Sequence, residues 1–360
     1  MFSKILDFWN TQIFDLLPQS NLHKPIICFD LEGPLSPQDN AYEVMAESSK
    51  GREIFEKISR YDDLLTLDGR MGYEPGDTLS LIVPFLLAYG IKTSDISRVS
   101  ERATIISGAK ELIERLGREG WEIYIISTSY EGHAYNIGRK LGIPRENIFC
   151  TELNLEEKRK KTGDDVIKLV LDVEKRLLET KGDEELKELL DELFFEELLR
   201  SSYDVLSEVK VIGGGRKLDA VLEISDRSKV PLDEILVVGD SITDYKMLEG
   251  VKKEEGVSVV FNGNEYAVPY ASIGLATTDM RWLHVITSNI SDIFEMVDLW
   301  EEKRDSDSEF IKCNLSTDLT RDVGELPYIH NLMRRDNFDE VIEIHKRYRE
   351  MMRGLSAKLG

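Results

Sequence analysis

Acidic residues follow two apolar segments that have the composition of buried strands. Asp30 ends the segment "PIICFD" and Glu32 comes two residues later, while Asp240 ends "EILVVGD" and Asp244 lies one helical turn beyond it. Carboxylates gathered in one place repel one another and resist ionisation unless a positive charge lies among them. Mg²⁺ meets this need because it binds a few carboxylates and keeps water or phosphate oxygens as its other ligands. The four carboxylates therefore predict a Mg²⁺ site.

Hydroxyl and cationic side chains follow other segments of the same kind. Ser127 and Thr128 end "WEIYIIST", and Lys217 follows three glycines in "GGGRKLDAV". A carboxylate, a metal, a cation and a hydroxyl donor together suit phosphoryl transfer, where catalysis is mostly positioning and charge neutralisation. Taken alone, an Asp or Ser at a strand end caps a helix just as well, and a lone lysine is usually solvated. Their joint occurrence in chain order predicts phosphoryl transfer.

Six short apolar segments are expected to form the strands that position these residues. They are "PIICFD" (25–30), "WEIYIIS" (121–127), "NIFCTEL" (147–153), "EILVVGD" (234–240), "VSVVF" (257–261) and "ASIGLA" (271–276). Helical patterns such as "GAKELIERLGREG" lie between most of them. Near-continuous apolar strands that alternate with helices indicate an α/β fold with a parallel sheet covered on both faces. Ligands of such sheets bind outside the carboxyl ends of the strands, where the polar residues fall.

Four stretches resemble the motifs of one family. "DLEGPL" (30–35), "IISTS" (125–129), Lys217 and "GDSITD" (239–244) are similar to the four motifs of haloacid dehalogenase superfamily phosphatases, with the phosphoserine-phosphatase-like branch nearest. The resemblance covers about residues 24–280. It implies a Rossmann-like core built from 24–40, 106–154 and 211–280, with a helical cap inserted at 41–105.

The resemblance also implies a role for each residue. Asp30 would attack phosphorus and become an aspartyl-phosphate, and Glu32 would protonate the leaving alkoxide and later activate water. Mg²⁺ would be held by Asp30, the Glu32 backbone carbonyl and Asp240, with Asp244 in support. Phosphate oxygens would be bound by Ser127, Thr128, Lys217 and Gly33, and Lys217 would also neutralise the charge of Asp30.

Two residues depart from the family pattern. Glu32 stands where the family usually has Asp, and the extra methylene moves the proton donor by about 1.5 Å. Pro34 stands where Thr or Val is usual, which removes a backbone N–H. Neither departure removes an essential group, so both bear on the rate and on the preferred leaving group. In the cap, the polar candidates for reading the leaving group are Asp39, Glu43, Arg52, Arg60 and Arg70.

Three further regions carry helical patterns. Residues 1–23 predict an N-terminal amphipathic helix, 155–210 a strongly charged helical insertion, and 281–360 a helical C-terminal extension. These regions offer surfaces unrelated to catalysis, so a protein partner that binds the N-terminal helix or the charged insertion is an open prediction. Some archaeal proteins of similar appearance are labelled as accessory subunits of energy-converting hydrogenases. A scaffold subunit that retains the fold, and a phosphotransferase of the same family, are therefore the alternatives to a phosphatase.

Composition limits the partners further. The chain has 360 residues and a formal net charge of −22, which argues against nucleic acid or an anionic membrane surface as the main partner and leaves a small phosphorylated substrate. No integral membrane segment is expected, because the best apolar stretch, 79–91, is short and contains a proline. The three cysteines fit no zinc spacing and indicate reduced thiols, so we expect a cytoplasmic protein.

Overall fold

A seven-stranded, mostly parallel sheet forms the centre of the computed structural model, which describes residues 23–201 and 209–354. The strand order is β3-β2-β1-β4-β5-β6-β7, and every neighbouring pair is parallel except β6 and β7. The strands are β1 (Ile26–Phe29), β2 (Glu122–Tyr130), β3 (Ile148–Thr151), β4 (Ile235–Gly239), β5 (Val257–Phe261), β6 (Ile273–Ala276) and β7 (Tyr328–Asn331). The predicted Rossmann-like α/β fold is confirmed. The helix expected over 1–23 lies almost wholly outside the described residues.

Helices cover both faces of the sheet. Successive residues of a strand point to opposite faces, and the strands are apolar on both. Ile27 and Phe29 of β1 pack on one face, while Ile26 and Cys28 pack on the other. The first face is covered by α7 (Ala109–Arg118), α8 (Glu131–Leu141), α14 (Leu283–Thr287) and α15 (Ile293–Lys303). The second is covered by α12 (Gly215–Ser228), α13 (Tyr245–Lys253) and α17 (Asp339–Arg353). All four strand residues are fully buried, as a two-sided apolar strand requires.

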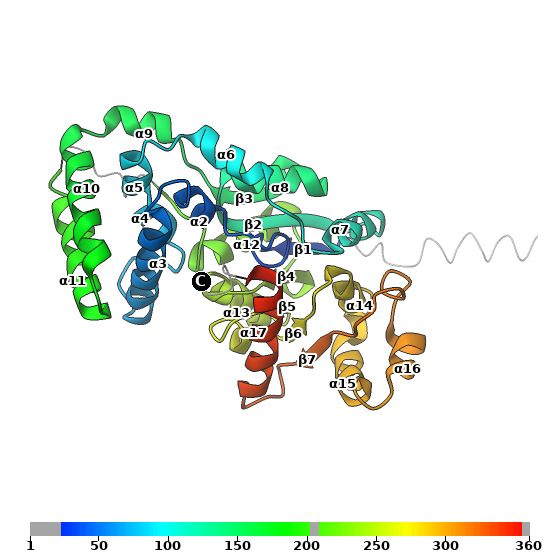
Figure 1. The fold of residues 1–360 in the computed structure, drawn as a ribbon. Helices are drawn as coiled ribbons and strands as arrows, with labels where there is room; N and C mark the ends of the chain where they lie inside the picture. The colour runs from blue at the N-terminus through cyan, green and yellow to red at the C-terminus, as the bar shows by residue number, and fades with distance from the viewer. Residues whose placement is uncertain (1–22, 202–208, 355–360) are drawn as a thin grey trace, which may run out of the picture.

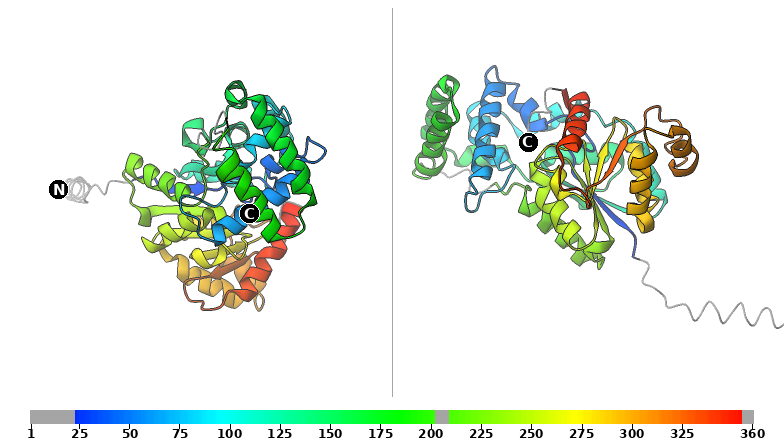
Figure 2. Two further views of the ribbon diagram at one scale, coloured as in Figure 1. Left: turned by 90° about the vertical axis from the view of Figure 1, so that its left-hand side faces the viewer. Right: turned by 90° about the horizontal axis from the view of Figure 1, so that it is seen from below.

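The two insertions share one hydrophobic core. The first contributes α2 (Asn40–Met45), α3 (Gly51–Leu67), α4 (Thr78–Leu81), α5 (Val83–Ala88) and α6 (Thr93–Glu101). The second contributes α9 (Leu155–Lys161), α10 (Asp164–Glu179), α11 (Asp183–Glu192) and a π-helical turn at Leu193–Glu197. Their apolar side chains form a single cluster, and α10 and α11 lie outside α3, on the side away from the sheet (Figures 1 and 2). The charged insertion therefore forms the outer layer of the cap.

Ion pairs join these two layers. Lys50 lies 2.9 Å from Glu174, and Arg60 lies 2.6 Å from Asp183. Arg70 lies 3.2 Å from Asp191 and also stacks on an aromatic ring of the second insertion. Arg60 and Arg70, which the sequence offered as candidates for reading a leaving group, are thus used to hold the cap together.

The C-terminal extension contains a strand, so the prediction that it is helical is wrong in this part. After α16 (Ser308–Phe310) and a π-helical turn at Ile311–Leu315, the chain forms β7 and pairs antiparallel with β6. The pairing covers an edge of the sheet that would otherwise be exposed. A strand of four residues is too short for its periodicity to reveal it. The chain then turns into α17, whose C-terminal end reaches the side of the sheet that faces the cap (Figures 1 and 2).

Among the described residues, no single helix has both the length and the apolarity to cross a bilayer. Thr78–Ala88 and Thr93–Glu101 meet the length and composition test only as a pair, with a bend of 109° between them.

Candidate active site at the strand ends

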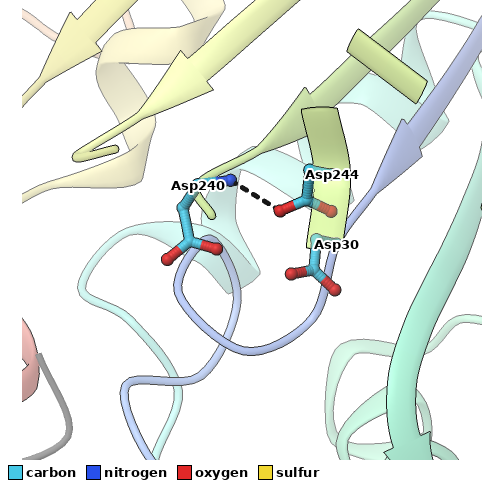
Figure 3. Close-up of side chains that lie close together, drawn as sticks. All are labelled: Asp30, Asp240 and Asp244. Carbon is cyan, nitrogen blue, oxygen red and sulfur yellow. Dashed lines mark hydrogen bonds between the residues drawn. The ribbon is translucent and has the colours of Figure 1, made fainter. Parts of the chain in front are cut away.

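Three aspartates converge at the carboxyl ends of β1 and β4. Asp30 directly follows β1 and Asp240 directly follows β4, and these two strands are parallel neighbours in the sheet. Asp244 lies in the 3₁₀ turn Ile242–Asp244 that comes next (Figure 3). One oxygen from each carboxylate lies within 4.8 Å of the others. The structure thus brings together three of the four carboxylates predicted to hold a metal through their side chains or backbone.

Lys217 binds two of these aspartates at once. Its Nζ lies 2.8 Å from Asp30 Oδ1 and 2.7 Å from Asp244 Oδ1, and the residue is fully buried. Burial lowers the pKa of Lys217, but the two carboxylates raise it by more, so the ammonium stays charged. The preceding glycines allow close packing, since a Cβ on Gly214 would lie 2.2 Å from Glu74 Oε2. A side chain at Gly214 would therefore collide with the cap loop at Glu74 and Pro75.

Asp30 is held in one orientation and is hard to ionise. Its Oδ1 accepts a hydrogen bond from the Leu31 N–H at 2.7 Å, and the same oxygen faces Lys217. Burial, and then the charge of Asp244, raise the pKa of Asp30 to about 7 despite the lowering effect of Lys217. Oδ1 is therefore engaged, and Oδ2 is the oxygen left for chemistry.

Glu32 lies beside Asp30 in a site that favours its protonated form. Burial, and then the charge of Asp39, raise the pKa of Glu32 to about 8. Its Oε1 accepts a hydrogen bond from the Asn40 N–H at 3.0 Å, which fixes the side chain. The same oxygen lies 3.6 Å from Nε2 of His133, a fully buried histidine whose pKa is lowered to about 3 by burial. A carboxyl group that holds its proton near neutral pH is suited to general acid catalysis.

The residues predicted to bind phosphate differ in which of their hydrogen-bonding groups are still free. Ser127 is fully buried, and its hydroxyl accepts the Ser129 N–H at 3.1 Å. Thr128 lines the pocket, and its buried hydroxyl has no hydrogen-bond partner. Gly33 donates its N–H to the Ser36 carbonyl at 2.8 Å, so this N–H is already used. Gly33 instead allows a close approach: with φ at +120°, a Cβ there would lie 2.3 Å from Asp240 Oδ2.

A pocket with a cavity volume of about 70 Å³ opens between these strand ends and the cap. The sheet contributes Asp30, Glu32, Ser127 and Thr128 to its lining. The cap contributes, among others, Asp39, Phe55, Ser59, Asp62, Thr78 and Leu79. The sequence had offered Asp39 as a cap residue that contacts the leaving group, and it does line the pocket. It had not offered Asp62, because a helix residue that lines a pocket has no local signature.

Two arginines of α17 also enter the site, and sequence reasoning missed both. Arg349 is 2% exposed and donates from Nη1 to the Asp240 carboxylate. Arg353 donates from Nη1 to Asp240 Oδ2 at 2.9 Å, and it also lines the pocket. The i, i+4 spacing that places them on one face of a helix was visible in the sequence. The sequence did not show which part of the protein that helix face packs against.

The donor set fits Mg²⁺. Three carboxylates lie close enough to share one hard cation, and Asp240 Oδ1 is buried without any hydrogen-bond partner. An unpaired buried carboxylate oxygen is costly, and a bound cation would satisfy it. The residues that would hold Mg²⁺ are therefore Asp30, Asp240 and Asp244.

Comparisons with known proteins agree with this geometry. The family described as haloacid dehalogenase-like hydrolase matches residues 106–278. A phosphoserine phosphatase from Archaeoglobus fulgidus is 21% identical over 245 residues, which cover 68% of this chain and 54% of the relative, so the match spans about half of that protein's length. The solved structure of gene product AF1437 from Archaeoglobus fulgidus superposes with a TM-score of 0.76 and 29% identity, covering 93% of this chain and 98% of that one.

The matched family region contains the second, third and fourth motifs, and β1 brings the first motif next to them. The match to AF1437 extends this likeness over nearly the whole chain. Residues 106–278 thus match the haloacid dehalogenase-like hydrolases, and the chain is similar to a phosphoserine phosphatase of that superfamily.

Proposed function

We propose that the protein is a Mg²⁺-dependent phosphomonoester hydrolase that acts through an aspartyl-phosphate on Asp30. The observation that carries this proposal is the contact of Lys217 with Asp30, which lines the pocket together with Glu32. A buried nucleophile, a fixed cation and a protonated acid are the groups that transfer of a phosphoryl group requires. The proposed substrate is a small phosphorylated metabolite.

The chain's own residues supply the bond changes. Asp30 Oδ2 attacks phosphorus, the bond from phosphorus to the leaving oxygen breaks, and Glu32 gives that oxygen its proton. Glu32, now ionised, takes a proton from a water molecule, which attacks the aspartyl-phosphate and releases inorganic phosphate and free Asp30. Lys217 stays on Asp30 and Asp244 throughout and offsets the negative charge. Mg²⁺, when bound, favours the ionised form of Asp30 and neutralises phosphoryl oxygens.

The test is a screen of the purified protein with Mg²⁺ against a panel of phosphomonoesters that includes phosphoserine and an aryl phosphate. We expect turnover of at least one member, and none from Asp30→Asn. An inactive wild-type protein on the whole panel would refute the proposal.

A non-catalytic scaffold is the second candidate. The observation that favours it is the occupation of Asp240 by two guanidinium groups, at the place where a divalent cation is expected. Such a subunit would bind protein partners through the N-terminal region or the charged insertion and would hydrolyse nothing. The same screen separates the two candidates.

A further inference from the structure

The C-terminal end of α17 supplies positive charge where the family's chemistry needs a divalent cation. Arg349 and Arg353 both donate to one oxygen of Asp240, while the other oxygen has no hydrogen-bond partner. Their side chains are 3% and 6% exposed, so both guanidinium groups are shielded from water.

The charges of the cluster already balance. Asp30, Asp240 and Asp244 contribute three negative charges when ionised, and Lys217, Arg349 and Arg353 contribute three positive ones. A divalent cation added to these six groups would leave them with an excess of two positive charges, close to both arginines. Like charges a few ångströms apart repel one another more strongly in a protein interior, with an effective dielectric constant of about 20, than they do in water. Pairing with arginine and binding of metal at Asp240 are therefore antagonistic.

Arg353 is the arginine that can move away from Asp240 with less disturbance of the fold. It is the last residue of α17, and Gly354 after it has a φ of +54°, so the helix ends there. Arg349 lies one turn further in and also donates to the backbone carbonyl of Asp240. Moving Arg353 disturbs only a helix end, whereas moving Arg349 disturbs a packed turn.

The surroundings of Arg353 favour an anion as its second partner. Among the described residues that line the pocket, it is the only cationic one, while four carboxylates line the same space: Asp30, Glu32, Asp39 and Asp62. A phosphate group that enters this pocket meets mostly negative charge. The Nε of Arg353 is buried and has no hydrogen-bond partner, so the guanidinium group has a donor to spare. A guanidinium binds phosphate oxygens with two parallel hydrogen bonds.

We propose that Arg353 holds Asp240 in the metal-free protein, leaves it when a divalent cation binds there, and then binds the anionic group of the substrate. The proposal rests on the proposed function and adds a substrate-binding residue to it. It makes metal and anion binding mutually supportive, because the anion gives Arg353 a new partner.

The first experiment measures metal affinity without substrate. Mn²⁺ is titrated into the full chain and free Mn²⁺ is followed by electron paramagnetic resonance, for wild type, Arg353→Gln, Arg353→Lys and Arg347→Gln. Arg347 is the matched control, since it lies exposed on the same helix against Tyr328 and Tyr348. We expect Arg353→Gln to bind Mn²⁺ about tenfold more tightly or better, within the usual range of coupling between sites. Arg353→Lys keeps the charge and should stay near wild type, as should Arg347→Gln.

The second experiment measures anion affinity. Inorganic phosphate is titrated calorimetrically into the Mn²⁺-saturated proteins. We expect Arg353→Gln to bind phosphate about tenfold more weakly than wild type, and Arg347→Gln to match wild type. In wild type, saturating phosphate should also tighten Mn²⁺ binding more than it does in Arg353→Gln, because the two effects are reciprocal.

The proposal is overturned if Arg353→Gln and Arg347→Gln have the same Mn²⁺ affinity, or if the loss of Arg353 leaves phosphate binding unchanged. Circular dichroism of each variant verifies that it is folded. Neither titration needs turnover, so an inactive protein would refute the phosphatase proposal and leave these results intact. Conversely, an active phosphatase with unchanged affinities would refute only the role of Arg353.

Discussion

Lys217 Nζ lies 2.8 Å from Asp30 Oδ1, and both side chains are shielded from solvent. The same ammonium also binds Asp244, so in the proposed mechanism this lysine has both a structural and a catalytic role. Removing it leaves two buried carboxylates without their nearest positive charge.

Replacement of this lysine therefore has two expected effects. Lys217→Met should abolish turnover and lower the free energy of unfolding by about 3–5 kcal/mol, as expected when one partner of a buried ion pair is lost. Urea unfolding and the aryl phosphate assay measure the two effects. Lys246→Met is the control, since Lys246 pairs with Glu74 near the surface and its loss should cost about 1 kcal/mol or less. Equal costs for the two variants would contradict the structural role.

Asp30→Asn keeps the size of the side chain and loses the nucleophile. We expect turnover to fall by about 10⁴-fold or more, as when a covalent nucleophile is removed elsewhere, while the fold survives. Mass spectrometry should detect no phosphorylated protein. Substantial residual activity would exclude Asp30 as the attacking group.

Glu32→Gln removes the proton donor and keeps the shape. Hydrolysis of the aspartyl-phosphate should slow by about 10²–10⁴-fold, so phosphorylated protein should accumulate from an activated substrate with a good leaving group. In wild type, burial and then Asp39 raise the pKa of Glu32 to about 8, so turnover of substrates with poor leaving groups should fall as pH rises through about 8. An unchanged pH profile in Glu32→Gln would show that another group carries the proton.

Removal of metal should stop catalysis without unfolding the protein. EDTA should abolish turnover of an aryl phosphate and Mg²⁺ should restore it. The circular dichroism spectrum should stay the same in both conditions, because Arg349, Arg353 and Lys217 neutralise the aspartates in the absence of metal. Full activity in excess chelator would refute metal dependence.

Asp62 makes stability depend on pH through a group that holds no metal. Burial raises its pKa to about 7, against the lowering effect of its hydrogen bonds from Tyr73 and Gly76. A carboxyl group with a raised folded-state pKa stabilises the fold fully below the unfolded pKa, near 4, and this contribution is lost as pH rises through about 7. Urea unfolding should show that the free energy of unfolding falls less between pH 5 and pH 8 in Asp62→Asn than in wild type. The exposed Asp68→Asn is the control and should behave as wild type.

The sequence predicted the sheet well because its strands are apolar on both faces and end in polar residues. Asp30 and Asp240 could be placed together in advance, since parallel neighbours end at the same edge. The packing of the two insertions into one cap depends on contacts between residues more than a hundred positions apart, such as Arg60 with Asp183. No local pattern carries that information. The same holds for Arg349, whose helix is plain in the sequence while its place over Asp240 depends on β7, a strand too short to detect.

The distance in sequence between Asp240 and Arg349 has a consequence for synthesis. The two residues are 109 positions apart, so Asp240 leaves the ribosome well before its guanidinium partner does. At about 5–20 residues per second, the delay is about 5–20 s. During that interval a divalent cation meets no competition from α17 at Asp240. Under the proposed function, the nascent chain would therefore bind Mg²⁺ most easily before the C-terminal helix exists.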